Sequence, residues 1–388
     1  MKRLKYILFI LLIACFSCDD FLDVKPTGEI VNNKLFETAE GFEEAIYGVY
    51  SFLAREPLYG KNMTYGLVDV VGQYFSGRWD KHWSNELRLY NYKHMEVRPE
   101  IDTIWISMYR GISYVNNMLE NLAERDPSEF ALYNVYKAEG LGLRAFMHFE
   151  LLRLFSESII QNPNATGIPY REKYSYQVTP FDPISESYNK IIRDFKEAER
   201  LLAEHGEYFD RTDENAGGFV KDRVIHMNLY AVQALLARVY WEKGDLETAK
   251  NYAMKVIEAP YFSMEAKTDV EDIMNGVISD KETIWGLYSE EFPNFTRDVL
   301  YSSGGSLSYD PKPDYRDIYE IDQDGFDYRL DKWFQTLSDH GAEGLRCMKV
   351  VDRFKVRLNT RPVTKLSGIN MIRLPELYYI VAEYYLLQ

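Results

Sequence analysis

Residues 234–249 read ALLARVYWEKGDLETA, and their pattern is the strongest indication of the fold in this chain. Its apolar positions recur three and four residues apart, which predicts two helices, over 224–241 and 246–258, joined by a turn at 242–245. Small side chains at Ala237 and Ala249 let two antiparallel helices approach closely, and the larger Leu236 and Tyr240 fill the space between them. The stretch therefore predicts a tightly packed helical hairpin.

The hairpin has the residue spacing of a tetratricopeptide (TPR) repeat, carried by Leu236, Ala237, Tyr240, Gly244, Asp245 and Ala249. The match is partial, because Ala253 stands where a large aromatic residue is usual and Val256 stands where alanine is usual. A helical hairpin outside any repeat family could show the same pattern. We expect an all-α fold in which TPR-like helical hairpins form a scaffold that carries long irregular loops.

The same periodicity predicts further helices on both sides of the hairpin. They lie over 38–53, 104–122 and 138–155, from 183 onward, and from Pro375 to the end of the sequence. Thr38 is the expected N-cap of the first, and Asp182 that of the fourth, with Pro183 in its first turn. The helix over 138–155 is apolar on nearly every side, which is typical of a buried helix. His148 within it is expected to be a core histidine and not a metal ligand.

Two long segments between these helices lack helical periodicity and are rich in aromatic residues. The first, between the helices that end at 53 and begin at 104, contains Tyr74, Arg78, Trp79, Trp83 and Asn85. The second lies within 261–365, where we expect loops with short elements, and contains Tyr301, Tyr309 and Tyr315. Sugars present flat apolar C–H faces and rims of hydroxyls, so their sites combine aromatic platforms with planar hydrogen-bonding groups. These eight residues are the predicted ligand-binding residues, although the same side chains could instead pin the loops to the scaffold.

Motifs for nucleotide or zinc chemistry are absent from the sequence. It has no phosphate-binding glycine loop, dinucleotide fingerprint, nucleophile elbow or zinc-binding histidine pair. We expect no catalytic residues and no cofactor, although 60 acidic residues leave carboxylate-pair glycoside hydrolysis open. Asp322, Asp324 and Asp331 form a degenerate calcium-loop pattern, for which a solvated acidic turn is the alternative.

The first 17 residues read as a secretory signal, with Lys2, Arg3 and Lys5 before a short apolar run. Ser17 precedes Cys18, as at a bacterial lipoprotein cleavage site, and Cys18 would carry the lipid. Cys15 is the alternative, because the residues before it fit the leucine-rich cleavage motif better. We expect residues 1–17 to be a lipoprotein signal peptide, 18–35 a lipid-anchored tether and 36–388 a single domain.

Net charge and cysteine content exclude some classes of partner and of fold. Three of the 45 basic residues lie in 1–17, which leaves 42 basic and 60 acidic residues and a net charge of −18. Such a chain repels nucleic acid and adsorbs poorly to anionic lipid, so the membrane contact is expected through the lipid anchor alone. Only Cys347 remains besides the two candidate anchor cysteines, so no disulfide framework is expected.

The order and spacing of several short motifs resemble those of the SusD-like (RagB/SusD) outer-membrane lipoproteins of Bacteroidetes. The motifs are CDDFLDVKP at 18–26, GFEEAIYGVY at 41–50, Trp105 to Asn116, Ala138 to Phe149, ALLARVY at 234–240 and IRLPE at 372–376. The acidic pair after Cys18 resembles the surface-export signal of these lipoproteins. The resemblance covers nearly the whole chain.

The resemblance implies a non-enzymatic protein that captures glycans or similar nutrients at the cell surface. It implies a SusC-like TonB-dependent transporter as partner, contacted through the TPR-like face, and glycan contacts from the two aromatic segments. Relative to the family pattern, we expect the C-terminal portion of the domain to be missing after Gln388. A surface-anchored glycoside hydrolase on an all-helical toroid is the alternative function.

Overall fold

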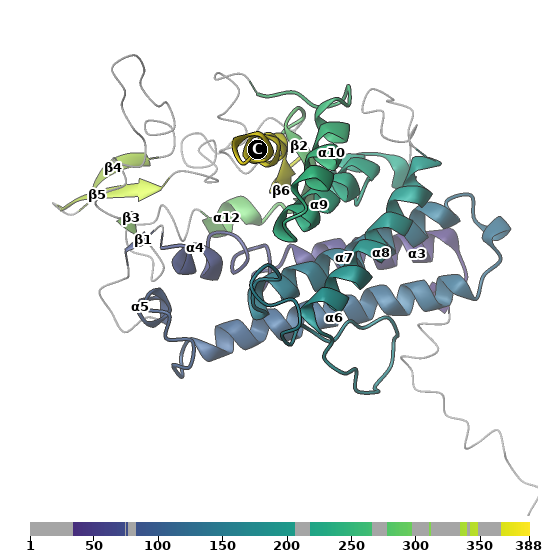
Figure 1. Ribbon diagram of the computed structural model, residues 1–388, viewed down its shortest axis with the longest axis horizontal. Coiled ribbons are helices and arrows are strands. Elements are labelled where there is room, and N and C mark those ends of the chain that lie inside the picture. The colour runs from purple at the N-terminus through teal and green to yellow at the C-terminus, as the bar shows by residue number, and fades with distance from the viewer. Residues whose placement is uncertain are drawn as a thin grey trace, which may run out of the picture.

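The computed structural model describes most of the chain and confirms the expected all-α, TPR-like architecture (Figure 1). It describes residues 34–73, 83–205, 218–265, 278–296 and 366–388, and the backbone of the short strands at 75–76, 310–311, 334–339 and 342–347. The domain boundaries expected at residues 17 and 35 border or fall in the part outside this description. Among the described residues, Phe36 is the first buried apolar side chain of the core.

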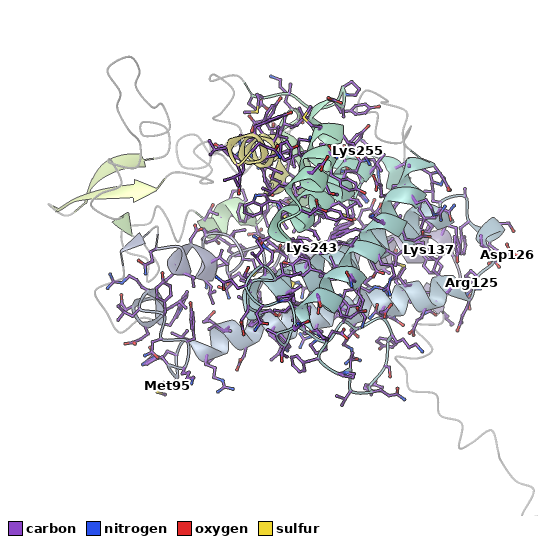
Figure 2. The ribbon with its side chains drawn as sticks, viewed as in Figure 1. Met95, Arg125, Asp126, Lys137, Lys243 and Lys255 are labelled. Atoms are coloured by element: carbon purple, nitrogen blue, oxygen red, sulfur yellow. The ribbon has the colours of Figure 1, made fainter. Side chains whose placement is uncertain are left out.

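The N-terminal half is built from long helices. Their bounds are α3 (Ala39–Leu53), α4 (Leu67–Val71), α5 (Trp83–Arg88), α6 (Arg98–Ala123), η1 (Pro127–Glu129) and α7 (Tyr133–Phe155). Thr38 caps α3 as predicted, because its hydroxyl accepts a hydrogen bond from the backbone N–H of Gly41 at 3.2 Å. Helix α6 begins six residues earlier than predicted and runs along the length of the molecule (Figure 1). Met95 lies near its start and Arg125 just beyond its end (Figure 2).

Helix α7 lies at the centre of the fold, packed against α6 on one side and α8 (Ile184–Ala203) on the other. Its buried residues cover all sides of the helix, as predicted from its uniform apolar character. The expected cap of α8 is wrong by one position, because Pro183 is the N-cap and Ile184 the first helical residue. The carboxylate of Asp182 pairs with Lys190 Nζ at 2.8 Å, and α8 has no side-chain cap.

The predicted TPR-like hairpin is formed by α9 (Leu229–Glu242) and α10 (Leu246–Ile257), after the short helices η3 (Gly218–Val220) and η4 (Arg223–Ile225). Helix α9 starts five residues later than predicted, because the side chain of Asn228 caps it by accepting from Ala231 N–H at 2.9 Å. Gly244 turns the chain between the two helices with φ of 82°, a left-handed conformation that disfavours side chains.

The C-terminal part adds a small sheet and a last helix to this hairpin. The elements are β2 (Thr283–Tyr288), α12 (Phe292–Thr296), β6 (Gly368–Arg373) and α16 (Leu374–Leu386). Strands β2 and β6 pair antiparallel, with Leu287 opposite Ile369. Helix α16 carries Pro375 in its first turn, as predicted, and packs against α10 and α9. Arg238 on α9 holds it through two hydrogen bonds to Glu376, at 2.6 and 2.7 Å.

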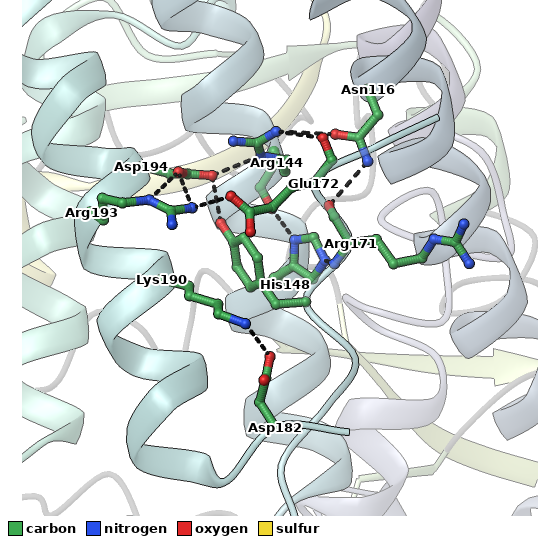
Figure 3. A network of polar contacts seen from close by, with 10 residues as sticks. Asn116, Arg144, His148, Arg171, Glu172, Asp182, Lys190, Arg193 and Asp194 are labelled. Atoms are coloured by element: carbon green, nitrogen blue, oxygen red, sulfur yellow. Dashed lines mark hydrogen bonds and ion pairs between the residues drawn. The ribbon is translucent and has the colours of Figure 1, made fainter. Parts of the chain in front are cut away.

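The segment between α7 and α8 is pinned to the core by a buried polar network (Figure 3). At its centre, Arg144 of α7 donates to Asp194 of α8 at 2.7 Å, and the hydroxyl of Tyr170 donates to the same carboxylate oxygen at 2.7 Å. Asn116 of α6 donates to the carbonyl of Arg171 at 3.0 Å. Asn116 of α6 and Arg144 of α7 donate to backbone carbonyls of this loop, and Asp194 of α8 accepts from its Tyr170 side chain, so three helices hold the loop.

His148 is a core histidine, as predicted, and its two ring nitrogens have different partners. Nε2 accepts from the backbone N–H of Arg171 at 3.0 Å, so the proton is on Nδ1, which donates to the carbonyl of Arg144 at 2.8 Å. Burial of the ring lowers the pKa of His148 to about 3. The neutral imidazole therefore bridges α7 and the loop.

We expect this histidine to make the protein less stable in mild acid. Between pH 6.5 and 3 the unfolded chain binds a proton at residue 148 that the folded protein does not, so stability falls as the pH falls. We expect a loss of about 1.6 kcal/mol from this residue between pH 6.5 and 5, as the slope rises toward about 1.4 kcal/mol per pH unit. Urea unfolding between pH 6.5 and 5, where most carboxylates stay ionised, measures it. A His148→Gln variant should show a flatter dependence, and an unchanged slope would assign the acid sensitivity to other groups.

Candidate ligand-binding site

The predicted site residues are only partly within the described structure. Trp83 and Asn85 lie on α5, whereas Tyr74, Arg78, Trp79, Tyr301, Tyr309 and Tyr315 lie outside the described residues. The same holds for Cys15 and Cys18 and for the calcium candidates Asp322, Asp324 and Asp331. These assignments stay predictions.

A strand pair joins the two aromatic segments. Strand β1 (Phe75–Ser76) pairs antiparallel with β3 (Asp310–Pro311), with Phe75 opposite Pro311 and Ser76 opposite Asp310. In the sequence, Tyr74 directly precedes β1 and Tyr309 directly precedes β3. Segments more than 230 residues apart in the sequence are therefore brought together at one end of the molecule, beside the hairpin of β4 (Phe334–Asp339) and β5 (Ala342–Cys347) (Figure 1).

Helix α5 presents its two predicted residues differently. Trp83 is half-buried and packs against the core, on the same side of the helix as the fully buried Leu87. Asn85 is also half-buried, but two helical positions from Trp83 it faces about 160° away. The side chain of Gln73, just after α4, donates to the carbonyl of Arg88 at 3.1 Å and fixes the end of α5. Trp83 thus has a packing role in addition to any contact with ligand.

A cleft lies between the end of α3 and the end of β2, and none of its residues was predicted as a site residue. It has a volume of about 620 Å³ and is lined by Ser51, Ala54, Arg55, Glu56, Pro57, Tyr288, Ser289, Glu290, Glu291 and Phe295. Tyr288 is 45% exposed, and its hydroxyl donates to Glu290 at 2.5 Å. An aromatic ring with adjacent carboxylates and a guanidinium is a suitable wall for a polar ligand with an apolar face. The apolar run of β2 was a usable sequence signal, but its pairing with β6 was not.

The described residues contain no candidate metal site and no candidate membrane-spanning helix. No group of three or more His, Cys, Asp or Glu side chains suited to a metal ion lies within 34–73, 83–205, 218–265, 278–296 or 366–388. Across the same ranges, none of the helices has the length and apolar character that a membrane crossing requires.

Known proteins share both sequence and fold with this chain. A SusD-like protein of Formosa agariphila is 23% identical over 325 residues, which are 78% of this chain and 52% of that protein. The chain thus spans about half the length of the curated relative that it matches.

Solved structures with the same fold come from Bacteroides species. A SusD superfamily protein of Bacteroides thetaiotaomicron superposes with a TM-score of 0.69 at 19% identity, over 90% of this chain and 76% of that one. A SusD-like carbohydrate-binding protein of Bacteroides vulgatus gives 0.65 at 21%, over 89% and 71%. The surface glycan-binding protein A of Bacteroides uniformis gives 0.63 at 18%, over 90% and 76%.

The sequence pattern of a protein family matches residues 20–241, which is more than half of the chain. That family is described as SusD-like, starch-binding and associating with the outer membrane. The match includes the core helices α3, α6, α7 and α8 and nearly all of α9. The chain therefore belongs to the SusD-like family of outer-membrane-associated binding proteins.

Proposed function

We propose that this protein is a cell-surface lipoprotein that binds glycans or similar nutrients and delivers them to a SusC-like TonB-dependent transporter in the outer membrane. The observation that carries the proposal is the pairing of β1 with β3, which joins the two aromatic segments predicted to hold ligand. A site built from distant segments on a rigid helical body keeps its shape while the loop residues vary with ligand. The proposed role is binding without bond cleavage.

The anchor in this proposal is a lipid on Cys18, followed by a tether to about residue 35. The described body begins at Lys34 and enters the core at Phe36, so the tether would lead directly into α3. A tether of this length lets the body move over its transporter while the lipid stays in the membrane. A Cys18→Ala variant that still partitions with the membrane would assign the lipid to Cys15.

The transporter contact is proposed for the TPR-like helices α8, α9 and α10. Helical repeats form extended surfaces that hold protein partners, and the paired strands β1 and β3 lie at one end of the molecule, away from α8, α9 and α10 (Figure 1). This arrangement leaves the aromatic end free to meet ligand while the scaffold holds the partner.

Replacing Trp79 or Trp83 with alanine is expected to weaken glycan binding by about 1–3 kcal/mol, the scale of a lost aromatic contact in a binding site. Isothermal titration calorimetry of the soluble body against a glycan panel measures it. Because Trp83 also packs against the core, Trp83→Phe and a thermal melt separate lost binding from lost folding. Tyr176→Ala, on a fully exposed ring in another loop, is the matched control.

Two outcomes would overturn the proposal. Unchanged affinity in both tryptophan variants would move the site away from the aromatic segments. Release of new reducing ends by the wild-type protein, abolished by replacing a single carboxylate, would favour the glycoside hydrolase.

A further inference from the structure

A second cleft lies on the first half of α6, and none of its residues is among the predicted site residues. It has a volume of about 380 Å³ and is lined by Tyr92, Lys93, Arg98, Ile101, Asp102, Trp105 and Phe155. Three separate parts of the chain contribute to it: the segment after α5, the first half of α6 and the last residue of α7. It lies at the end of α6 that Met95 marks in Figure 2 and shares no lining residue with the larger cleft.

The aromatic wall of this cleft is held in place. Trp105 is half-buried, and its ring meets Phe155 edge-on, with the ring centres 4.9 Å apart and the planes at 83°. Phe181 stacks on it nearly parallel, at 6.4 Å and 19°. Tyr109 lies 4.9 Å away and is itself fixed by a hydrogen bond from its hydroxyl to the carbonyl of Pro169 at 2.9 Å. Tyr92, 47% exposed, completes a platform that does not need to reorganise when a flat ligand arrives.

The charged rim of the cleft is net positive although the chain is strongly acidic. Arg98 and Asp102 form an ion pair at 3.5 Å, and both side chains are mostly exposed. Lys93 has no ion-pair partner among the residues that the structure describes. Two cations and one carboxylate leave one positive charge at the rim, against −15 for the whole sequence. The unbalanced group is a flexible ammonium beside an aromatic wall.

We propose that this cleft is a second binding site, specific for a sugar ring that bears an anionic group. The apolar face of the ring would lie on Tyr92 and Trp105, and its carboxylate or sulfate would accept charge-assisted hydrogen bonds from Lys93 and Arg98. That the ligand is a sugar rests on the proposed glycan-binding role, whereas its anionic group is inferred from the net positive charge of the rim. The site would select acidic glycans that the aromatic loops need not distinguish from neutral ones.

Calorimetry with three tetrasaccharides tests the site: tetragalacturonate for a carboxylate, sulfated neocarratetraose for a sulfate, and β-1,4-galactotetraose as the neutral ligand. At low salt, at least one anionic tetrasaccharide should bind about tenfold or more tightly than the neutral one, the scale of one charge-assisted hydrogen bond. Lys93→Met should remove this preference, and Tyr92→Ala should weaken binding at the cleft. Lys221→Met, which removes another exposed lysine, should leave all three affinities unchanged.

The outcomes separate this site from the proposed main site. If Lys93→Met loses the preference for anionic sugars and Trp79→Ala keeps that preference in full, the cleft is supported as an independent site. No anionic preference in the wild type, or a preference that survives both Lys93→Met and Tyr92→Ala, overturns it. The proposed main site then stands or falls on the tryptophan variants alone. A cleft that served only as a protein contact surface would likewise show no anionic preference.

Discussion

An Asp194→Ala variant is expected to lose about 3–5 kcal/mol of unfolding free energy, because it leaves the buried charge of Arg144 without its partner. The two side chains are 4% and 8% exposed, and Arg144 Nε lies 2.7 Å from the carboxylate. The cost therefore exceeds that of a typical surface ion pair by several fold.

Asp194 also holds two other groups that the variant would release. Tyr170 donates its hydroxyl to one carboxylate oxygen at 2.7 Å, and Arg193 donates to the other at 2.9 Å (Figure 3). Burial raises the pKa of Asp194, but the two arginines and the tyrosine hydroxyl outweigh it, so the net shift is downward. The carboxylate is thus ionised in the folded protein. Its stabilisation is lost only when the pH falls through this lowered pKa.

Urea unfolding at neutral pH measures the loss, and Glu197→Ala is its matched control. Glu197 lies on the same helix, three residues after Asp194, and pairs with Arg200 on the exposed surface at 3.0 Å. The control should cost less than about 1 kcal/mol. Equal losses in the two variants would contradict the assigned importance of the buried network. Because Tyr170 lies in the loop that carries Phe181, Asp194→Ala should also weaken anionic sugar binding at the second cleft.

The long helices were predictable from the regular spacing of their apolar residues, whereas the short α4 and α5 lie in a segment predicted to lack helical periodicity. The start of α3 at Ala39, its end at Leu53 and the side-chain cap of Thr38 agree with the prediction. Helix α10 ends within one residue of its predicted end. Periodicity, cap chemistry and the left-handed glycine of the hairpin are local properties, so they can be read from a window of a few residues.

The predictions failed where a distant partner decides the local structure. Asp182 has the right side chain for an N-cap, but its carbonyl accepts from Gly167 N–H at 2.8 Å and its carboxylate pairs with Lys190. Helix α9 starts late because Asn228 caps it while also donating to the carbonyl of Ile284 in β2, at 3.0 Å. Gly167 and Ile284 lie 15 and 56 residues from the residues that they contact, so a short sequence window does not reveal them.

The candidate sites were also predictable only in part. The two aromatic segments could be identified from composition, but their union through β1 and β3 could not, because the paired stretches are short and far apart. The second cleft was hidden for a different reason. Trp105 fits the apolar face of α6, so its spacing indicates only core packing, and the half-exposed ring becomes informative once Tyr92 and Lys93 are placed beside it.

Replacing Glu139 with alanine is the second large effect expected, with a loss of about 3–5 kcal/mol of unfolding free energy. Glu139 is fully buried on α7, and both of its oxygens are engaged. Arg223 of η4 donates to one oxygen at 2.5 Å, and the other accepts from the Tyr50 hydroxyl at 2.5 Å and lies 3.1 Å from His226 Nδ1. The Tyr50 oxygen in turn accepts from the backbone N–H of Met227 at 2.7 Å.

This cluster ties three parts of the scaffold together: α3, α7 and the segment that leads into the TPR-like hairpin. Burial alone would raise the pKa of Glu139, but Arg223 and His226 shift it downward overall. The residue is therefore an anion that neutralises a buried guanidinium. Its removal leaves Arg223, which is 5% exposed, as an unpaired buried charge. The free energy lost comes mainly from that arginine and not from the deleted carboxylate.

A double variant separates these two contributions. Glu139→Leu with Arg223→Met replaces the buried pair with apolar side chains, which at other buried pairs is often neutral or stabilising. We expect it to recover more than half of the loss seen in Glu139→Ala, with a remainder from the unpaired Tyr50 hydroxyl and His226. Glu44→Ala, on the exposed face of α3, should change stability by less than about 0.5 kcal/mol. A double variant at least as unstable as Glu139→Ala would mean that the hydrogen bonds to Tyr50 and His226, and not the arginine charge, hold the hairpin to the core.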